Sequence, residues 1–134
     1  MNLSRTVAQF MERQVETLGY DSMLSDAFKV MVQQNQRSVV IVDDRGIMGL
    51  INASDMARFI IQERDLKGSS IRDFMTFCSL SGPAPCIQIS DDDTLLNALK
   101  VMVMWGADVV VVVDRNNNLV GTIDLLQALK GIKD

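Results

Sequence analysis

Residues 27–32 read Ala-Phe-Lys-Val-Met-Val, and residues 98–103 read Ala-Leu-Lys-Val-Met-Val. Five of these six positions are identical at an offset of 71 residues. The match continues through Val39 and Val40, which recur as Val110 and Val111, and through Gly49 and Ile51, which recur as Gly121 and Ile123. The chain is therefore one supersecondary unit written twice, and every other residue is interpreted within that repeat.

The chain length favours two copies that share one core. A chain of 134 residues is ordinary for one compact domain. Each copy has only about 60–70 residues, which is marginal alone because so short a chain buries too little of its surface. We therefore expect copies at residues 1–67 and 68–134 that pack sheet to sheet, with pseudo-twofold symmetry, in a single compact domain.

The spacing of apolar residues predicts an α+β fold with the same element order in each copy. For the first copy we expect a short amphipathic helix within residues 1–12, an extended piece at 15–18, a helix ending near 34, strands at 38–42 and 47–51, and a helix at 53–64. For the second copy we expect an extended piece at 86–89, a helix capped by Ser90, strands at 109–113 and 119–123, and a helix from Asp124 to about Gly131. Five consecutive valines at 109–113 predict a strand that is buried on both faces.

Composition argues against several classes of function. The net charge of −4 disfavours non-specific nucleic-acid binding, which needs a basic surface. No apolar run approaches the roughly 20 residues of a membrane helix, and the N-terminus lacks the apolar core of a secretory signal. The chain contains no histidine, the commonest general base. We therefore expect a cytoplasmic protein without catalytic residues that binds neither nucleic acid nor a membrane.

The candidate metal ligands are weak. Two thiols, Cys78 and Cys86, lie between the copies and have no histidine to complete a metal set, so we expect them to be reduced cytosolic thiols. Asp91, Asp92 and Asp93 are expected in the first turn of a helix, where carboxylates interact favourably with the helix dipole. Neighbouring helical residues point in different directions, so no metal site is predicted there.

The repeated pieces, in one order and in register, resemble a tandem pair of CBS domains, a regulatory fold also called a Bateman module. Each copy supplies an apolar-x-x-Phe-Met motif, at 7–11 and at 71–75, then the matching helix, then a strand ending in Val-Asp, then a Gly-initiated strand and helix. The resemblance covers nearly the whole chain. It implies two βαββα units with two clefts that, in many members, bind AMP, ADP, ATP or S-adenosylmethionine.

The resemblance also implies which residues of the first copy would hold such a ligand. The family pattern is a Gly, two apolar residues, Thr or Ser, two further residues and an Asp that accepts hydrogen bonds from the ribose hydroxyls. Asp55 falls on this ribose position, and Asn52 falls where Thr or Ser helps to hold phosphate. Arg58 and Arg37 would add positive charge, and the candidate adenine walls are Val15, Val39, Val40 and Ile51. Without the family context, Asp55 is equally an ordinary helix cap, the arginines are surface residues and the valines are core.

In the second copy, the candidates are Val110, Thr122 and Asp124, and two alignments remain open. With a three-residue gap after Ile123, Asp124 is the ribose carboxylate. Without a gap, Asp124 takes the phosphate position and Gln127 the ribose position. In either alignment we expect a shortened loop, and a carboxylate at the phosphate position would repel an anion. The first copy is therefore expected to hold the better site.

Two functions compete. The first is a regulatory module that binds an adenine nucleotide and signals to an unidentified protein partner or to its dimer mate. The second is an interaction module without a nucleotide, because soft apolar side chains are numerous and adaptable at binding surfaces: Met31, Met56, Met102, Met104 and Trp105. For these side chains, core packing is the alternative. The resemblance implies a homodimer formed through helix faces.

Overall fold

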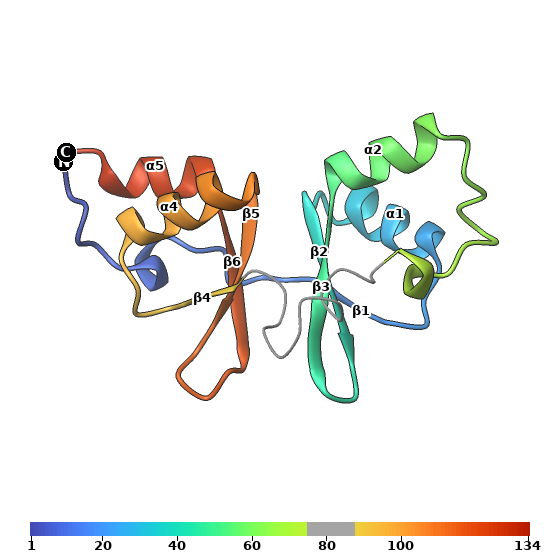
Figure 1. The fold of residues 1–134 in the computed structure, drawn as a ribbon, viewed down its shortest axis with the longest axis horizontal. Helices are drawn as coiled ribbons and strands as arrows, with labels where there is room; N and C mark the ends of the chain where they lie inside the picture. Colours follow the sequence, from blue (N-terminus) through green and yellow to red (C-terminus); the bar gives the residue numbers. More distant parts are fainter. Residues whose placement is uncertain (75–87) are drawn as a thin grey trace. The chain divides into compact units, whose positions relative to one another are not determined.

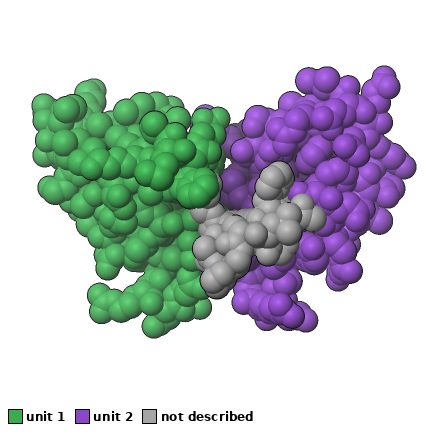
Figure 2. Space-filling model, viewed as in Figure 1, with its two compact units in different colours: residues 1–15, 87–134 green, residues 16–86 purple. Residues whose placement is uncertain are grey.

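The computed structural model of the chain describes residues 1–74 and 88–134 (Figure 1). The chain forms two compact units, coloured separately in Figure 2. Unit 1 comprises residues 1–15 and 87–134, and unit 2 comprises residues 16–86. The expected boundary between the two sequence copies, at residues 67 and 68, stays a prediction. The compact units are divided differently, because residues 1–15 belong to the same unit as the second copy. Cys78 and Cys86 lie outside the described residues.

Each unit has a three-stranded mixed sheet, which confirms the α+β class. Unit 2 contains β1 (Thr17–Gly19), α1 (Leu24–Gln33), β2 (Ser38–Asp43), β3 (Gly46–Asn52), α2 (Ala53–Ile61) and η2 (Ile71–Asp73). Unit 1 contains η1 (Val7–Gln9), β4 (Gln88–Ser90), α4 (Leu95–Trp105), β5 (Val109–Val113), β6 (Leu119–Asp124) and α5 (Leu125–Ile132). The sheet orders are β1-β2-β3 and β4-β5-β6, with the first pair parallel and the second antiparallel in each.

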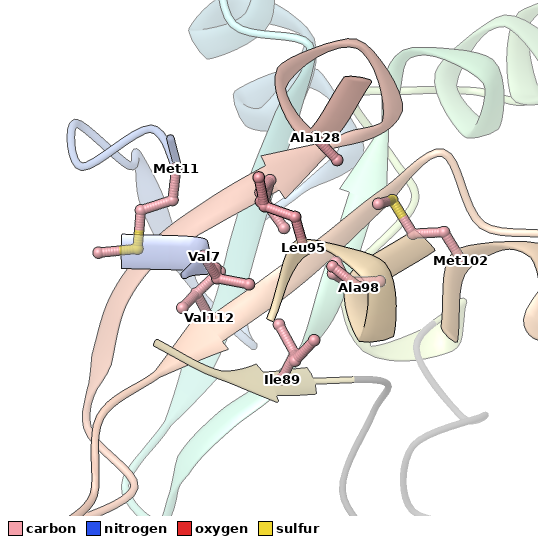
Figure 3. Close-up of a cluster of buried hydrophobic side chains, with 10 residues drawn as sticks. Val7, Met11, Ile89, Leu95, Ala98, Met102, Val112 and Ala128 are labelled. Carbon is pink, nitrogen blue, oxygen red and sulfur yellow. The ribbon is translucent and has the colours of Figure 1, made fainter. Parts of the chain in front are cut away.

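The two helices of each unit lie on the same side of its sheet (Figure 1). In unit 1, the hydrophobic core lies between the sheet and these helices (Figure 3). In β5, Val110 and Val112 belong to the core formed with α4 and α5. Because side chains alternate along a strand, Val111 points to the opposite face. All three are at most 1% exposed, which confirms that β5 is buried on both faces.

The N-terminal segment does not form the expected amphipathic helix. Only the 3₁₀ turn Val7–Gln9 is helical, because the backbone groups of this segment bind the second copy instead. The N–H of Val7 donates to the carbonyl of Asp93 at 2.9 Å, and Glu12 and Thr122 exchange backbone hydrogen bonds of 2.8 and 3.0 Å. Val7 is fully buried in the core of unit 1.

In unit 2, the segment that begins the second copy makes the equivalent backbone bonds and also contributes a buried side chain. The N–H of Ile71 donates to the carbonyl of Ser22 at 2.8 Å, and the N–H of Leu24 donates to the carbonyl of Ser69 at 2.9 Å. Ile71 is fully buried in the core of unit 2. Each copy thus donates its first turn to the other copy's compact unit, which the repeat alone does not reveal.

Two helix boundaries differ from the expectation. The cap of α4 is Thr94, not Ser90: its hydroxyl accepts from the N–H of Asn97 at 3.1 Å. The three aspartates therefore precede the helix, where Asp93 accepts from the N–H of Thr94 at 2.9 Å. The helix expected to reach residue 64 ends at Ile61, and Glu63 follows with a left-handed φ of 58° that a continuing helix does not permit.

Within residues 1–74 and 88–134, no helix is long and apolar enough to span a membrane.

Candidate functional site

Asn52 and Asp55 meet at the start of α2. Asn52 is the last residue of β3 and the N-cap of α2. Its side-chain oxygen accepts from the N–H of Asp55 at 2.8 Å, and the Asp55 carboxylate accepts from the N–H of Asn52 at 3.0 Å. This reciprocal capping box satisfies two backbone donors and fixes both side chains at the first turn of the helix. The structure therefore brings together the two residues assigned to phosphate and ribose.

Arg58 lies one turn along α2 and pairs with Asp55. Its guanidinium is 2.9 Å from the second carboxylate oxygen of Asp55, with side-chain exposures of 57% and 25%. One oxygen of Asp55 thus accepts from Asn52 and the other from Arg58. A carboxylate has about four acceptor positions, so each oxygen of Asp55 retains capacity for one further donor. That capacity matches a pair of vicinal hydroxyls.

Arg37 reaches the same helix start through its backbone. The carbonyl of Arg37 accepts from the N–H of Ala53, the first residue of α2, at 2.8 Å. This bond fixes the backbone of Arg37 beside the positive end of the α2 dipole. A role for the Arg37 guanidinium in holding phosphate stays a prediction.

The candidate adenine walls are placed differently from one another. Val39 and Ile51 are at most 1% exposed and belong to the core of unit 2. Val40 is also fully buried, on the strand face opposite to its neighbour Val39. Val15 is half-buried and belongs to unit 1. Contact with adenine stays a prediction for all four residues.

The start of α5 has the same geometry as the start of α2, without a gap. Asp124 caps α5 by accepting from the N–H of Gln127 at 2.7 Å, and the Gln127 side-chain oxygen accepts from the N–H of Asp124 at 2.9 Å. The structure thus selects the gap-free alignment, in which Asp124 corresponds to Asn52 and Gln127 to Asp55. The expected shortening of this loop is wrong, because β6 passes into α5 just as β3 passes into α2.

Register identifies a further residue that sequence reasoning missed. The N–H of Leu125, the first residue of α5, donates to the carbonyl of Asp108 at 3.1 Å. This bond is equivalent to the one that the carbonyl of Arg37 accepts from Ala53 at the start of α2. Asp108 therefore stands where Arg37 stands, at the offset of 71 residues seen in the opening repeat. The sequence contained the signal needed to find Asp108: adding the repeat offset of 71 residues to the position of Arg37 gives Asp108.

Val110 and Thr122, the other second-copy candidates, are buried, and their contact with a ligand stays a prediction. Val110 is 1% exposed and belongs to the core of unit 1. Thr122 is 8% exposed, and its backbone pairs with Glu12. The side chain of Thr122 occupies the position of Leu50 in unit 2, because these residues face Val111 and Val40 in the two registers.

The two helix starts differ in charge although they share a backbone geometry. The start of α2 has an uncharged cap with two arginines and one carboxylate. At α5, Asp124 replaces the uncharged cap, Asp108 replaces Arg37, and Lys130 replaces Arg58. Carboxylates repel an anionic ligand at short range, so the α5 start is less favourable to a phosphate than the α2 start.

In the part of the chain that the structure describes, no three His, Cys, Asp or Glu residues are grouped so that they could hold a metal ion. In the β5–β6 turn, the backbone N–H of Asn118 donates to Asp114 at 2.9 Å and lowers the pKa of this carboxyl. This interaction orders the turn and lies apart from either helix start in sequence and register.

The family model of the CBS domain matches the chain twice, over residues 7–62 and 71–134. Among solved structures, an uncharacterized conserved protein from Pyrococcus horikoshii is 16% identical with a TM-score of 0.82, covering 100% of this chain and 96% of that one. A CBS domain protein from Pyrobaculum aerophilum complexed with AMP is 17% identical with a TM-score of 0.78, covering 92% and 89%.

A third solved structure is a CBS domain pair in complex with 5′-methylthioadenosine and S-adenosyl-L-methionine. It is 20% identical with a TM-score of 0.76, and the match covers 94% of each chain. Identities of this size show a shared fold. No curated protein sequence matches the chain.

Proposed function

This chain belongs to the CBS domain family, and we propose that it is a regulatory protein that binds an adenine nucleotide at the start of α2. The observation that carries the proposal is the capping box of Asn52 and Asp55 with Arg58 beside it. The dipole of a helix start attracts phosphate, and the remaining acceptor capacity of Asp55 suits ribose hydroxyls.

The two helix starts differ in charge, so each is expected to favour a different kind of adenosine ligand. The α2 start, with two arginines, favours AMP, ADP or ATP. The α5 start, with Asp108 and Asp124, favours an adenosine compound without phosphate, such as S-adenosylmethionine, or no ligand. One structural relative forms a complex with AMP and another with S-adenosyl-L-methionine, which supports an adenosine ligand as the class to test.

The first test is a titration of AMP, ADP, ATP and S-adenosylmethionine, followed by calorimetry and by melting temperature. A ligand that binds only the native state raises its stability. We expect AMP to raise the melting temperature, and Asp55→Ala to weaken AMP binding by about tenfold or more, since a hydrogen bond to a charged group contributes about 1.5–3 kcal/mol. Gln127→Ala is the matched control, because it removes the same half of a capping box at α5. Equal losses in both variants would contradict the assignment.

The second test exchanges the two helix caps. Asn and Asp are equally good caps, so Asp124→Asn leaves α5 intact and removes one negative charge from its start. Two unit charges about 4 Å apart interact by about 1 kcal/mol in water, so we expect AMP to bind the α5 start about fivefold more tightly. The reverse substitution, Asn52→Asp, is expected to weaken AMP binding at α2 by a similar factor. Calorimetry that finds both exchanges neutral would refute the charge argument.

A second candidate function is an interaction module that acts as a homodimer or on a protein partner without a nucleotide. It is favoured by Met104 and Trp105, which are 76% and 64% exposed. The other soft side chains do not support it, because Met31, Met56 and Met102 are at most 8% exposed. If no adenosine compound shifts the melting temperature at millimolar concentration, this second function stands and nucleotide sensing fails.

A further inference from the structure

The N-terminal segment, residues 2–12, is bound to unit 1 at both of its ends (Figure 1). At its outer end, the N–H of Asn2 donates to the carbonyl of Ile132 in α5 at 2.9 Å. At its inner end, Glu12 exchanges two backbone hydrogen bonds with Thr122 in β6. The segment is therefore fastened to a helix and to the sheet of unit 1.

Arg5 adds a side-chain contact to these backbone bonds. Its guanidinium donates to the carbonyl of Gly131 at 2.9 Å and lies 5.8 Å from the centre of the Phe10 ring. A cation interacts favourably with the C-terminal end of a helix dipole, and Gly131 lies at that end of α5. Ser69 has the equivalent position in the second copy, two residues before its apolar-x-x-Phe-Met motif. The charged contact is thus particular to the N-terminal segment.

Three residues link this segment to the sheet of unit 2. Residues 13–15 follow Glu12, and the carbonyl of Glu16 then accepts from the N–H of Val40 at 3.0 Å. Four peptide steps span at most about 14 Å, so the link has few conformations while both of its ends are bound. By contrast, residues 75–87 separate the segment that docks on unit 2 from β4.

The far end of the link is close, in the strand register, to the proposed nucleotide site. Val40, which binds Glu16, is two residues along β2 from Ser38, and Ser38 pairs with Asn52, the cap of α2. The first strand, β1, comprises only Thr17–Gly19 and lies at the edge of its sheet. So short an edge strand has little pairing of its own, and its stability depends on what holds β2 and the link.

We propose that the N-terminal segment is a releasable element whose docking on unit 1 is coupled to nucleotide binding at the start of α2. The inference rests on the proposed function and specifies how that site is regulated. Nucleotide bound at Asn52 fixes the end of β2, and docking fixes the link, so both events order β1. The event that comes first leaves less conformational entropy for the second to lose. Each event therefore favours the other, by the same factor.

Hydrogen exchange of the full chain, with and without saturating AMP, measures the docking. The amides of Val7, Ala8 and Glu12 donate to carbonyls of unit 1, and we expect AMP to slow their exchange about fivefold or more. They are expected to exchange faster than the amides of β5, which report global unfolding. The amide of Asn118, which donates to Asp114 within the β5–β6 turn, is the control and is expected not to change.

Arg5→Ala tests whether the segment is released as a unit. The variant removes the contact with Gly131 and leaves the backbone bonds in place, so we expect the amides of Val7 and Ala8 to exchange about tenfold faster without AMP. Arg115→Ala is the matched control, because it removes the same charge from the β5–β6 turn of the same unit, and it is expected to leave this exchange unchanged.

Val7→Asp tests the reciprocal effect on AMP affinity. Val7 is fully buried in the core of unit 1, and an ionised carboxylate is strongly disfavoured there, so the segment stays undocked. Calorimetry is expected to show AMP binding weakened by the factor by which AMP slows exchange in the unaltered chain. Gln9→Asp adds the same charge at an exposed position of the segment and is expected to leave AMP affinity unchanged.

The outcomes separate this inference from the proposed function. AMP that binds without slowing exchange at Val7, Ala8 and Glu12 refutes the coupling and leaves the nucleotide site standing. Equal slowing at Asn118 shows a general effect of AMP and overturns the coupling as well. AMP that does not bind the chain refutes both. If Val7→Asp does not fold, the exchange measurements on the unaltered chain and on Arg5→Ala still decide.

Discussion

Leu95→Ala is expected to lower the free energy of unfolding by about 2–5 kcal/mol, the range measured when a large buried aliphatic side chain is truncated. Leu95 is fully buried and belongs to the core cluster of unit 1 (Figure 3). It begins α4 and touches α5 so closely that a Cβ on Gly131 would overlap the Leu95 side chain. Its neighbours come from several elements that cannot all collapse into the space, so a cavity remains.

Urea denaturation followed by circular dichroism measures this loss. Leu95→Met conserves volume and is expected to cost less than about 1.5 kcal/mol. Leu24, also fully buried, is the equivalent residue in unit 2, and Leu24→Ala is expected to produce a loss of the same order. Hydrogen exchange separates the two, because each variant is expected to deprotect the amides of its own unit first. A cost below about 1 kcal/mol for Leu95→Ala would show that the core of unit 1 repacks.

The repeat allowed the element order and the burial pattern to be predicted because both depend on local periodicity. Hydrophobic spacing located the strands within one or two residues, and the valine run of β5 required burial on both faces. Helix starts were less accurate, because several residues near each start are good caps. Ser90 and Thr94 both have the chemistry of an N-cap, and only the backbone bonds of the preceding turn decide for Thr94.

The exchange of first turns between the copies could not be predicted from the sequence. Val7 and Ile71 begin motifs with the same internal spacing, and each would satisfy an apolar position in either unit. Long-range backbone bonds make the choice, such as those from Val7 to Asp93 and between Glu12 and Thr122. Such pairing has no local signature, because any backbone segment can supply it.

The candidate site was predicted in part. Family resemblance and capping chemistry both pointed to Asn52 and Asp55, and the structure places them in one hydrogen-bonded box. The second site was ambiguous, because Asp124 is equally acceptable as a cap and as a ribose ligand. Only its bond with Gln127 shows that Asp124 is the cap. Once Asp124 is paired with Asn52 and Asp108 with Arg37, the difference in charge between the two helix starts can be read from the aligned residues.

Gly121→Ala is expected to cost about 1–3 kcal/mol of stability through overpacking, with the damage confined at first to the N-terminal segment. A Cβ on Gly121 would overlap the backbone carbonyl oxygen of Glu12 and lie 3.2 Å from the sulfur of Met11. A backbone oxygen cannot rotate away as a side-chain end can. Relief therefore requires the segment to withdraw, which breaks the bonds between Glu12 and Thr122.

Loss of that contact also threatens the core, because the same segment carries Val7 into unit 1. We expect the amides of Val7 and Glu12 to exchange faster in Gly121→Ala, together with a lower melting temperature. Gly19→Ala is the matched control, because its nearest atom would be the Ser22 hydroxyl at 4.0 Å, and it is expected to leave both measurements unchanged. Unchanged exchange at Glu12 in Gly121→Ala would mean that the exchange of first turns does not depend on this close approach, and that the buried side chain of Val7 alone holds the segment in place.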